Sequence, residues 1–237
     1  SSGAALQLPP DQAQHLVRVL RLQAGAAIRL FNGQGGEFDA SIGSIARNAV
    51  TVQIGAHHSI DRESPLQVTL LQGIARGEKM DLILQKATEL GVTAVVPVTT
   101  LRSTVRLDAE TTARKHAHWQ GVLAGACEQS GRNTIPSLGS AIALESAVAG
   151  NSSQLKLVLE PGDASSLKTL LSAAFHARMQ NPTICILVGP EGGLDEREIQ
   201  TAKLAGFQSC QLGPRVLRTE TAALAALAAL QSLAGDL

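Results

Sequence analysis

The feature that most constrains the fold of this 237-residue chain is a regular alternation of strand-like and helix-like segments from residue 66 onward. Short apolar runs predict strands, and longer segments with apolar residues three and four positions apart predict helices. We expect strands at 66–74, 94–98, 155–161, 183–189 and 207–213, and helices at 78–91, 109–129, 165–178, 195–205 and 219–234. This alternation is typical of a mostly parallel sheet covered on both faces, so residues 66–237 are predicted to form an α/β domain.

Residues 1–64 follow a different pattern, with three strand-like runs after a short helical entry. The runs lie at 26–31, 36–45 and 49–55, and the Asn-Gly in "NGQGG" (32–36) predicts a hairpin turn between the first two. A β unit of this size usually closes as a small barrel. We therefore expect a β-barrel domain over 1–64, joined to the α/β domain by a linker near 61–65.

Composition excludes several classes of function. Twenty basic residues balance twenty acidic ones, so the chain is not a polycation that coats nucleic acid by net charge. Aromatic residues make up 2% of the chain, too few for a surface that stacks bases. Any recognition of RNA must therefore use arginine side chains and backbone groups.

Three cysteines, an odd number far apart in the sequence, predict buried thiols in a reducing compartment, and hence a cytoplasmic location. The most apolar run, 221–235, is too short and too rich in alanine to span a bilayer. The histidine pairs at 57–58 and at 116 and 118 lack further ligands at suitable spacing, so we assign no metal site.

Three predicted strands end in marked turns: "LEPGD" (159–163), "VGPEGG" (188–193) and "LGPRVLR" (212–218). Ligands of open α/β sheets bind beyond the carboxyl ends of the strands. Glycine allows close approach of the backbone, proline fixes the turn, and Glu160 and Glu191 add negative charge. This chemistry suits a ligand with an adenine and a cationic centre and disfavours a triphosphate. The alternative is that these are only tight turns between strand and helix.

The stretch "LGPRVLRTETAA" (212–223) carries two arginines before a helix. Thr219 is predicted to cap that helix, with Glu220 favourably placed in its first turn. Arg215 and Arg218 precede it and can bind phosphate or stabilise an anion.

Two other stretches contain arginine residues that are candidates for contact with RNA. In "ACEQSGRN" (126–133), Gly131 ends a helix before Arg132 and Asn133, and the alternative is a simple helix end with polar residues. In "HLVRVLRLQAG" (15–25), Leu16, Val19 and Leu20 are predicted to form an apolar stripe. Arg18 and Arg21, three positions apart, are either a solvated face or a grip for RNA phosphates.

Six segments together resemble the RsmE family, bacterial methyltransferases of the SPOUT class that act on small-subunit ribosomal RNA. They are "HLVRVLR", "NGQGGEFDA", "RGEKMDLILQKATELGV", "ACEQSGRN", "LVGPEGGL" and "LGPRVLRTETAA", in one order over nearly the whole chain. The resemblance implies a PUA-like N-terminal barrel and a C-terminal SPOUT domain with a deep trefoil knot. It also implies S-adenosylmethionine as methyl donor, a homodimer, and methylation of N3 of one uridine in the 16S rRNA of the 30S subunit. Relatives usually carry a short basic segment before the barrel, whereas "SSGAALQLPP" has no basic side chain.

The resemblance also implies roles for individual residues. The methyl donor would be held by Leu159, Glu160, Pro161, Gly189, Pro190, Glu191, Gly192, Leu212, Gly213, Arg215, Val216 and Leu217. The catalytic candidates are Arg218 and Arg132 for anion stabilisation and Glu220 as the base, with Glu191 as the alternative base. The RNA contacts would be Arg18, Arg21 and Asn133.

Rival functions stay open at this point. One is a related SPOUT enzyme that methylates a ribose hydroxyl or a tRNA base, and the other is a non-catalytic module that binds RNA. A dimer is expected from the helix at 219–234, because a helix that is apolar nearly all round must be covered on more than one side.

Overall fold

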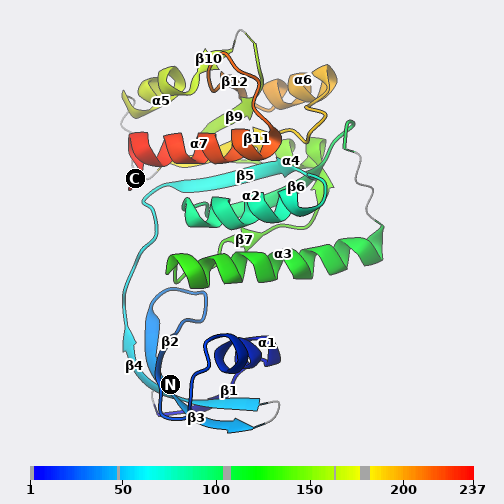
Figure 1. Cartoon of the computed structure of the whole chain (residues 1–237). Helices are drawn as coiled ribbons and strands as arrows, with labels where there is room; N and C mark the ends of the chain where they lie inside the picture. Colours follow the sequence, from blue (N-terminus) through cyan, green and yellow to red (C-terminus); the bar gives the residue numbers. More distant parts are fainter. Residues whose placement is uncertain (1–2, 47–48, 104–107, 163, 177–181) are drawn as a thin grey trace. The chain divides into compact units, whose positions relative to one another are not determined.

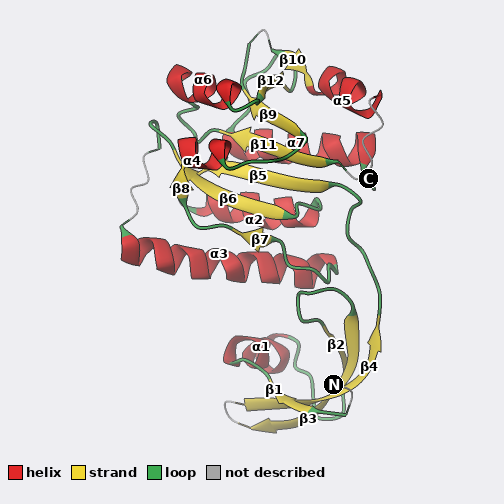
Figure 2. Cartoon of the chain, turned by 180° about the vertical axis from the view of Figure 1, so that it is seen from behind, coloured by secondary structure: helices red, strands yellow, loops and turns green. Residues whose placement is uncertain are grey.

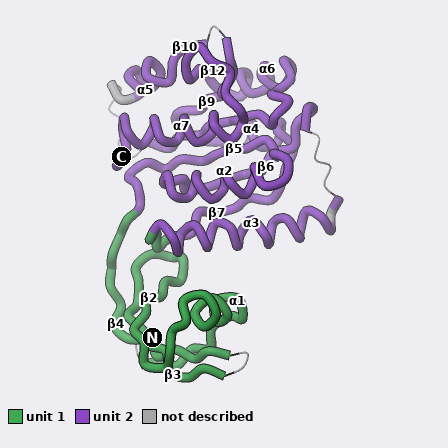
Figure 3. Tube along the Cα trace, in the orientation of Figure 1, with its two compact units in different colours: residues 1–62, 131–134 green, residues 63–130, 135–237 purple. Residues whose placement is uncertain are grey.

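The computed structural model describes residues 3–46, 49–103, 108–162, 164–176 and 182–237 (Figure 1). The chain divides into two compact units (Figure 3). Unit 1 contains Ser1–Arg62 together with Gly131–Thr134, and unit 2 contains Glu63–Ser130 and Ile135–Leu237. The boundary falls beside the predicted linker, but the assignment of 131–134 to the N-terminal unit was not foreseen from the sequence.

Unit 2 is built on one sheet whose strand pairings, among the described residues, are all parallel. Its strands are β5 (Gln67–Gly73), β6 (Ala94–Thr99), β7 (Ser137–Leu138), β8 (Ile142–Ala143), β9 (Leu155–Leu159), β10 (Ser165–Ser166), β11 (Thr183–Val188) and β12 (Gln208–Gln211). The order across the sheet is β10-β12-β9-β11-β5-β6-β7, and β8 also pairs with β6. The prediction of a mostly parallel sheet is confirmed, and all five expected strands are present.

Helices cover both faces of this sheet. They are α2 (Glu78–Glu89), α3 (Ala109–Ser130), α4 (Leu144–Ala149), α5 (Leu167–His176), α6 (Glu196–Leu204) and α7 (Thr219–Ala234). The helices α2 and α7 lie in front of the sheet in Figure 1, and α4 lies in front of it in the reverse view of Figure 2. Sequence patterns missed α4 and the two-residue strands β7, β8 and β10, because such short elements contain too few residues to show a period.

The central strand β11 shows why helices must cover both faces of the sheet. Ile184 and Ile186 belong to the larger core, with α2 and α7, whereas Cys185 and Leu187 belong to the core beneath α4 and α6. Alternate side chains of one strand point to opposite faces, so a strand buried on both faces is apolar at every position. The predicted apolar stripe of α2 is confirmed as well, since Met80, Ile83, Leu84 and Ala87 are buried.

Unit 1 is a four-stranded antiparallel sheet in the order β1-β4-β3-β2, with a short helical segment packed on it. Its elements are β1 (Ala5–Gln7), α1 (Pro10–Gln14), a π-helical turn η1 (His15–Val19), β2 (Ala27–Leu30), β3 (Glu37–Ala46) and β4 (Ala49–His58). The hairpin predicted at 32–36 is confirmed, because β2 and β3 pair in antiparallel fashion on either side of it.

The predicted stripe of Leu16, Val19 and Leu20 is wrong in part. Leu16 packs against the small core of unit 1, but Val19 and Leu20 are 64% and 51% exposed. The helical turn ends at Val19, and Arg21 then adopts a left-handed backbone with φ of 53°. The helical spacing that would place Arg18 and Arg21 together therefore does not apply, although both side chains are exposed.

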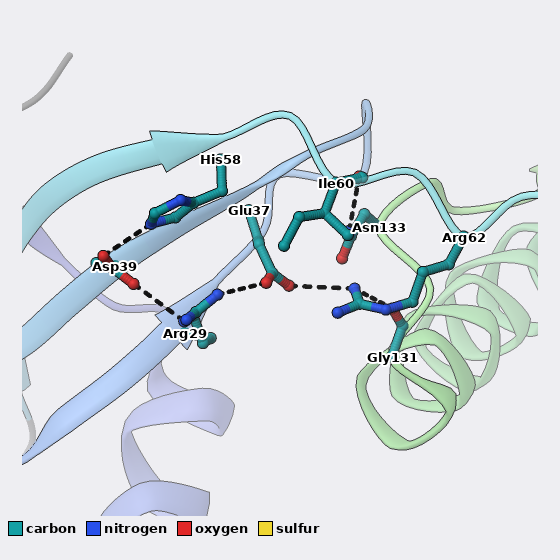
Figure 4. Close-up of polar contacts among 8 residues, drawn as sticks. All are labelled: Arg29, Glu37, Asp39, His58, Ile60, Arg62, Gly131 and Asn133. Carbon is teal, nitrogen blue, oxygen red and sulfur yellow. Dashed lines mark hydrogen bonds and ion pairs between the residues drawn. The ribbon is translucent and has the colours of Figure 1, made fainter.

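The segment Gly131–Thr134 completes unit 1 by pairing with its hairpin. Gln34 and Thr134 form an antiparallel bridge, and the Gly35 N–H donates to the Asn133 carbonyl at 3.1 Å. The Asn133 side-chain amide donates to the Ile60 carbonyl at 3.2 Å (Figure 4). This unit is therefore assembled from two separate stretches of the chain.

A row of charged side chains leads across β2, β3 and β4 to this segment (Figure 4). Glu37 accepts from Arg29 at 2.5 Å and from Arg62 at 3.3 Å, and Arg62 also donates to the Gly131 carbonyl at 3.1 Å. At the other end, Asp39 contacts Arg29 at 3.0 Å and His58 at 2.8 Å. The Glu37 side chain is 11% exposed, so it is the enclosed centre of the row.

We expect Glu37→Gln to lower the unfolding temperature at neutral pH. Burial would raise the pKa of Glu37, but hydrogen bonds and charge attraction from Arg62 and Arg29 outweigh it and lower the pKa overall. A lowered pKa stabilises the fold above the unfolded value and ceases to do so as the pH falls through the folded one. The difference between wild type and variant should therefore shrink in acid. Thermal melts from pH 7 down to pH 3 test this, with the exposed Glu145→Gln as control. A constant difference at every pH would contradict it.

Candidate functional site

The three loops singled out in the sequence meet at one edge of the unit 2 sheet. The strands β12, β9 and β11 are neighbours, so their carboxyl ends lie side by side. The loops that follow them line a cavity of about 760 Å³. All twelve residues predicted to hold a cofactor line it, from Leu159 to Pro161, from Gly189 to Gly192, and at 212, 213 and 215–217. The structure thus brings them together, while their binding role stays a prediction.

Close backbone packing shapes the loop at 189–193. The Gly193 N–H donates to the Pro190 carbonyl at 2.9 Å, and Gly193 has a φ of 70°. A Cβ atom on Gly73 would lie 2.5 Å from the backbone nitrogen of Pro190, and one on Gly192 would lie 3.2 Å from the Arg102 carbonyl oxygen. Glycine at these positions therefore lets the loop lie against β5 and against the chain after β6.

Glu160 and Glu191, the two carboxylates among the residues predicted to hold the cofactor, are each paired with a lysine. Lys79 Nζ lies 3.3 Å from Glu191 Oε1, and Lys203 Nζ lies 3.4 Å from Glu160 Oε1. Both lysines line the cavity, and sequence reasoning missed them. The signal for Lys79 was its place at the start of α2, directly after β5, whose carboxyl end lies at the same edge.

Glu191 is held as a carboxylate. Burial acts to raise its pKa, but hydrogen bonds from the backbone N–H groups of Glu191 and Arg76 and the ammonium of Lys79 outweigh burial, so the pKa is lowered. The Arg76 N–H donates to Glu191 Oε1 at 3.1 Å. Glu191 is therefore an anchored anion at the wall of the cavity.

The start of α7 forms another part of the wall. Arg218, not Thr219, is the residue before the first helical turn, and its side chain makes no capping bond. The predicted cap is thus wrong. The Thr219 hydroxyl instead donates to the Gly189 carbonyl at 2.6 Å, because its backbone is already helical and its side chain points back to β11.

The candidate Arg218 lines the cavity, as does Arg215, and both are exposed. Neither makes an ion pair within the described parts of the chain. Glu220 does not line the cavity. Its Oε2 atom is enclosed, lies 4.0 Å from Lys79 Nζ and accepts no hydrogen bond from the described residues.

Two candidates lie elsewhere. Arg132 and Asn133 belong to unit 1 and are 5% and 4% exposed. The Asn133 amide is buried and donates to the Ile60 carbonyl at 3.2 Å, and its RNA contact stays a prediction. Arg132 is a buried residue of the same segment, and a catalytic role for it stays a prediction.

The three cysteines are buried, as the sequence indicated, and none of these described residues is in a disulfide. Burial raises the pKa of the Cys185 and Cys210 thiols to about 12. Cys210 lines the cavity, but a thiol with so high a pKa is a poor nucleophile.

Within the described residues, His, Cys, Asp and Glu side chains form no group of three that could hold a metal ion. None of the helices in those parts of the chain has the length and apolar character needed to cross a membrane.

Comparison with known proteins accounts for both units. Residues 62–231 match the RNA methyltransferase domain family, and residues 8–55 match the RNA methyltransferase PUA domain family. The chain is 31% identical over 222 residues to ribosomal RNA small subunit methyltransferase E of Bacillus subtilis, covering 93% of this chain and 87% of that protein. The chain belongs to the methyltransferase E family.

Solved structures of similar proteins agree in fold. Methyltransferase E of Neisseria gonorrhoeae, bound to S-adenosyl methionine, is 41% identical with a TM-score of 0.89, covering 100% of this chain and 95% of that one. A Legionella pneumophila putative methyltransferase in complex with the same cofactor is 40% identical with a TM-score of 0.93, again covering 100% and 95%. The family and the PUA-plus-SPOUT fold class that the motifs indicated are confirmed. The trefoil knot stays a prediction.

Proposed function

We propose that this protein transfers a methyl group from S-adenosylmethionine to N3 of one uridine in the 16S rRNA of the 30S ribosomal subunit. Membership of the methyltransferase E family makes it an RNA methyltransferase. The observation that carries the proposal is the cavity beyond β9, β11 and β12, lined by the three Gly-Pro or Glu-Pro loops. A relative 41% identical over the whole of this chain is bound to the same cofactor.

The cavity fits this methyl donor in size and chemistry. Its volume of about 760 Å³ lies within the range of roughly 300–1,000 Å³ typical of small-molecule sites. Backbone groups of the loops at 159–161, 189–193 and 212–217 can contact a flat adenine ring. Glu160 and Glu191 supply negative charge near a sulfonium, while Arg215 and Arg218, which make no ion pair with the described residues, suit the phosphates of an RNA substrate.

Uridine N3 carries a proton, so its lone pair must be freed before it can accept a methyl group. S-adenosylmethionine, when bound, supplies that methyl group on a positively charged sulfur. As the N3–H bond breaks, negative charge develops on the uracil oxygens, and an exposed cation fixed at the start of α7 can stabilise it. We assign this role to Arg218, which lines the cavity and makes no ion pair with the other described residues.

Glu220 is our proposed proton acceptor. Its Oε2 accepts no hydrogen bond from the described residues and lies 4.0 Å from Lys79 Nζ, and an acceptor of this kind favours a donor such as N3–H. Because Glu220 does not line the cavity, this role requires its side chain to turn toward the bound uridine. The rival acceptor is Glu191, which lines the cavity but is already held by Lys79 and by the Arg76 N–H.

Docking of the RNA uses unit 1 in this proposal. Arg18 and Arg21 are exposed cations of the PUA-like unit and can contact phosphates without base specificity.

The proposal also includes a homodimer. Leu233 of α7 is 52% exposed, so part of this apolar helix is uncovered in the single chain. A monomeric mass by light scattering at micromolar concentration would contradict the dimer. The substrate and the buried thiols favour the cytoplasm.

The function is tested by methyl transfer from labelled donor to purified 30S subunits and, in parallel, to free 16S rRNA. Digestion to nucleosides is expected to yield 3-methyluridine, with 30S subunits the better substrate. Label in a 2′-O-methyl nucleoside, or in tRNA only, would favour a related SPOUT activity. Binding of RNA without binding of the donor would favour a non-catalytic module.

We expect Gly192→Val to weaken binding of S-adenosylmethionine while the chain stays folded. A Cβ at Gly192 would lie 3.1 Å from the Arg102 Cβ and 3.2 Å from the Arg102 carbonyl oxygen, so a branched side chain there forces the cofactor loop to shift. Overpacking costs about 1–3 kcal/mol, which is roughly a tenfold to hundredfold loss of affinity. Calorimetric titration measures it, with Gly121→Val as control, because a Cβ at Gly121 meets nothing within 4 Å. Unchanged affinity in Gly192→Val would show that the cofactor loop is misplaced.

Arg218→Ala is expected to lower kcat by about a hundredfold to a thousandfold at saturating RNA and donor, the usual loss for one preorganised charge-stabilising group. Glu220→Gln should do the same if it accepts the proton, whereas Glu191→Gln should act mainly on donor affinity. Single-turnover rates on 30S subunits and thermal melts of all three variants separate these effects. A normal saturated rate with lost stability in Arg218→Ala would return this residue to a structural role.

A further inference from the structure

Three buried polar groups meet at the carboxyl edge of the unit 2 sheet. The Thr219 hydroxyl, at the start of α7, donates to the carbonyl of Gly189, just after β11, at 2.6 Å. Gln72, near the end of β5, donates its side-chain amide to the same hydroxyl at 3.0 Å. Thr219 is 6% exposed and Gln72 is fully enclosed. One hydroxyl therefore connects two neighbouring strands with the start of α7, where Arg218 precedes the first turn and Glu220 lies within it.

The direction of these bonds is fixed. A hydroxyl has one hydrogen, and because the Gln72 amide donates to Thr219, that hydrogen is available for the Gly189 carbonyl. Gln72 has no freedom to turn away, since the same amide also donates to the Gly73 carbonyl at 2.8 Å. The arrangement thus specifies one position for α7 relative to the cofactor loop.

This arrangement is not the most stable way to fill the space. Gln72 Oε1 is buried and accepts no hydrogen bond from any described residue. An unsatisfied buried acceptor is costly, and two apolar side chains of similar size would leave none. Polar groups that break the packing rules in this manner are typical of functional positions.

The backbone on both sides leaves little room for adjustment. Gly73 lies so close to the 189–190 loop that even a Cβ atom would collide with Pro190. The loop is therefore held by β5 from one side and by Thr219 from the other. Arg218 directly precedes Thr219 and Glu220 directly follows it, so the hydroxyl sets the position of both proposed catalytic side chains.

We propose that Thr219 is a positioning residue for methyl transfer: its hydroxyl, oriented by Gln72, holds the Gly189 loop and the start of α7 in one register, so that cofactor and catalytic side chains face each other. This proposal rests on the proposed function. It concerns the rate of the chemical step, because small errors in the placement of reacting groups lower that rate strongly.

The test compares Thr219→Val, which removes the hydroxyl at constant volume, with Thr219→Ser, which restores it. We expect Thr219→Val to lower kcat at saturating donor and RNA by roughly tenfold to a hundredfold, and Thr219→Ser to recover most of that loss. Thr88→Val is the matched control. Thr88 is also fully buried, and its hydroxyl donates to the Leu84 carbonyl at 2.8 Å inside α2, away from the cavity. It should lower the melting temperature but leave kcat unchanged.

Wild-type kcat in Thr219→Val would overturn the proposal, as would a loss of rate in Thr88→Val of equal size. If Thr219→Val does not fold, Gln72→Met takes its place, since it keeps the hydroxyl and removes the amide that orients it, together with the bond of that amide to the Gly73 carbonyl. The kcat of Gln72→Met should fall as well, and an unaltered kcat in this variant would equally overturn the proposal. A wild-type protein that methylates no uridine would contradict the proposed function instead, so the two failures are distinguishable.

Discussion

The parallel pairing of β11 with β9 on one side and β5 on the other is the constraint on which the rest of unit 2 depends. Parallel strands send all their carboxyl ends to the same edge, so loops more than fifty residues apart in the chain become neighbours there. Because β11 is buried on both faces, its register is fixed by two cores at once. A slip of one residue would exchange Ile186 and Leu187 between those cores and displace the loop that begins at Gly189.

Charge at this edge is arranged in local pairs rather than as a field of one sign. Glu160 and Glu191 each have a lysine within about 3.5 Å, and Arg102 contacts Asp195 at 3.2 Å. Partly exposed pairs of this kind contribute little stability. Their effect is to hold Glu160 and Glu191 at fixed points of the cavity wall, whereas Arg215 and Arg218 make no ion pair with the described residues.

The motif "GRN" shows how a recognisable segment can have another role than its composition suggests. Arg132 and Asn133 are polar and follow a helix, so an exposed surface was the natural expectation. Instead the segment bridges to the β2–β3 hairpin, and Arg62 joins it to Glu37. The PUA-like unit is thus completed by four residues that lie in the middle of the methyltransferase sequence. A fragment that ends at residue 62 lacks them.

The sequence by itself determined the parallel sheet, the hairpin at 32–36 and the three loops of the cavity. These follow from local patterns: apolar periodicity, Asn-Gly, and Gly-Pro after a strand. The elements β7, β8, β10 and α4 escaped prediction because two residues show no strand alternation and six residues are fewer than two turns of a helix. Only the tertiary structure decided that Lys79 faces Glu191, that Arg132 is buried, and that Thr219 bonds to Gly189 and Gln72. Each of these contacts joins residues distant in the chain, and a local pattern contains no information about a partner that only folding brings near.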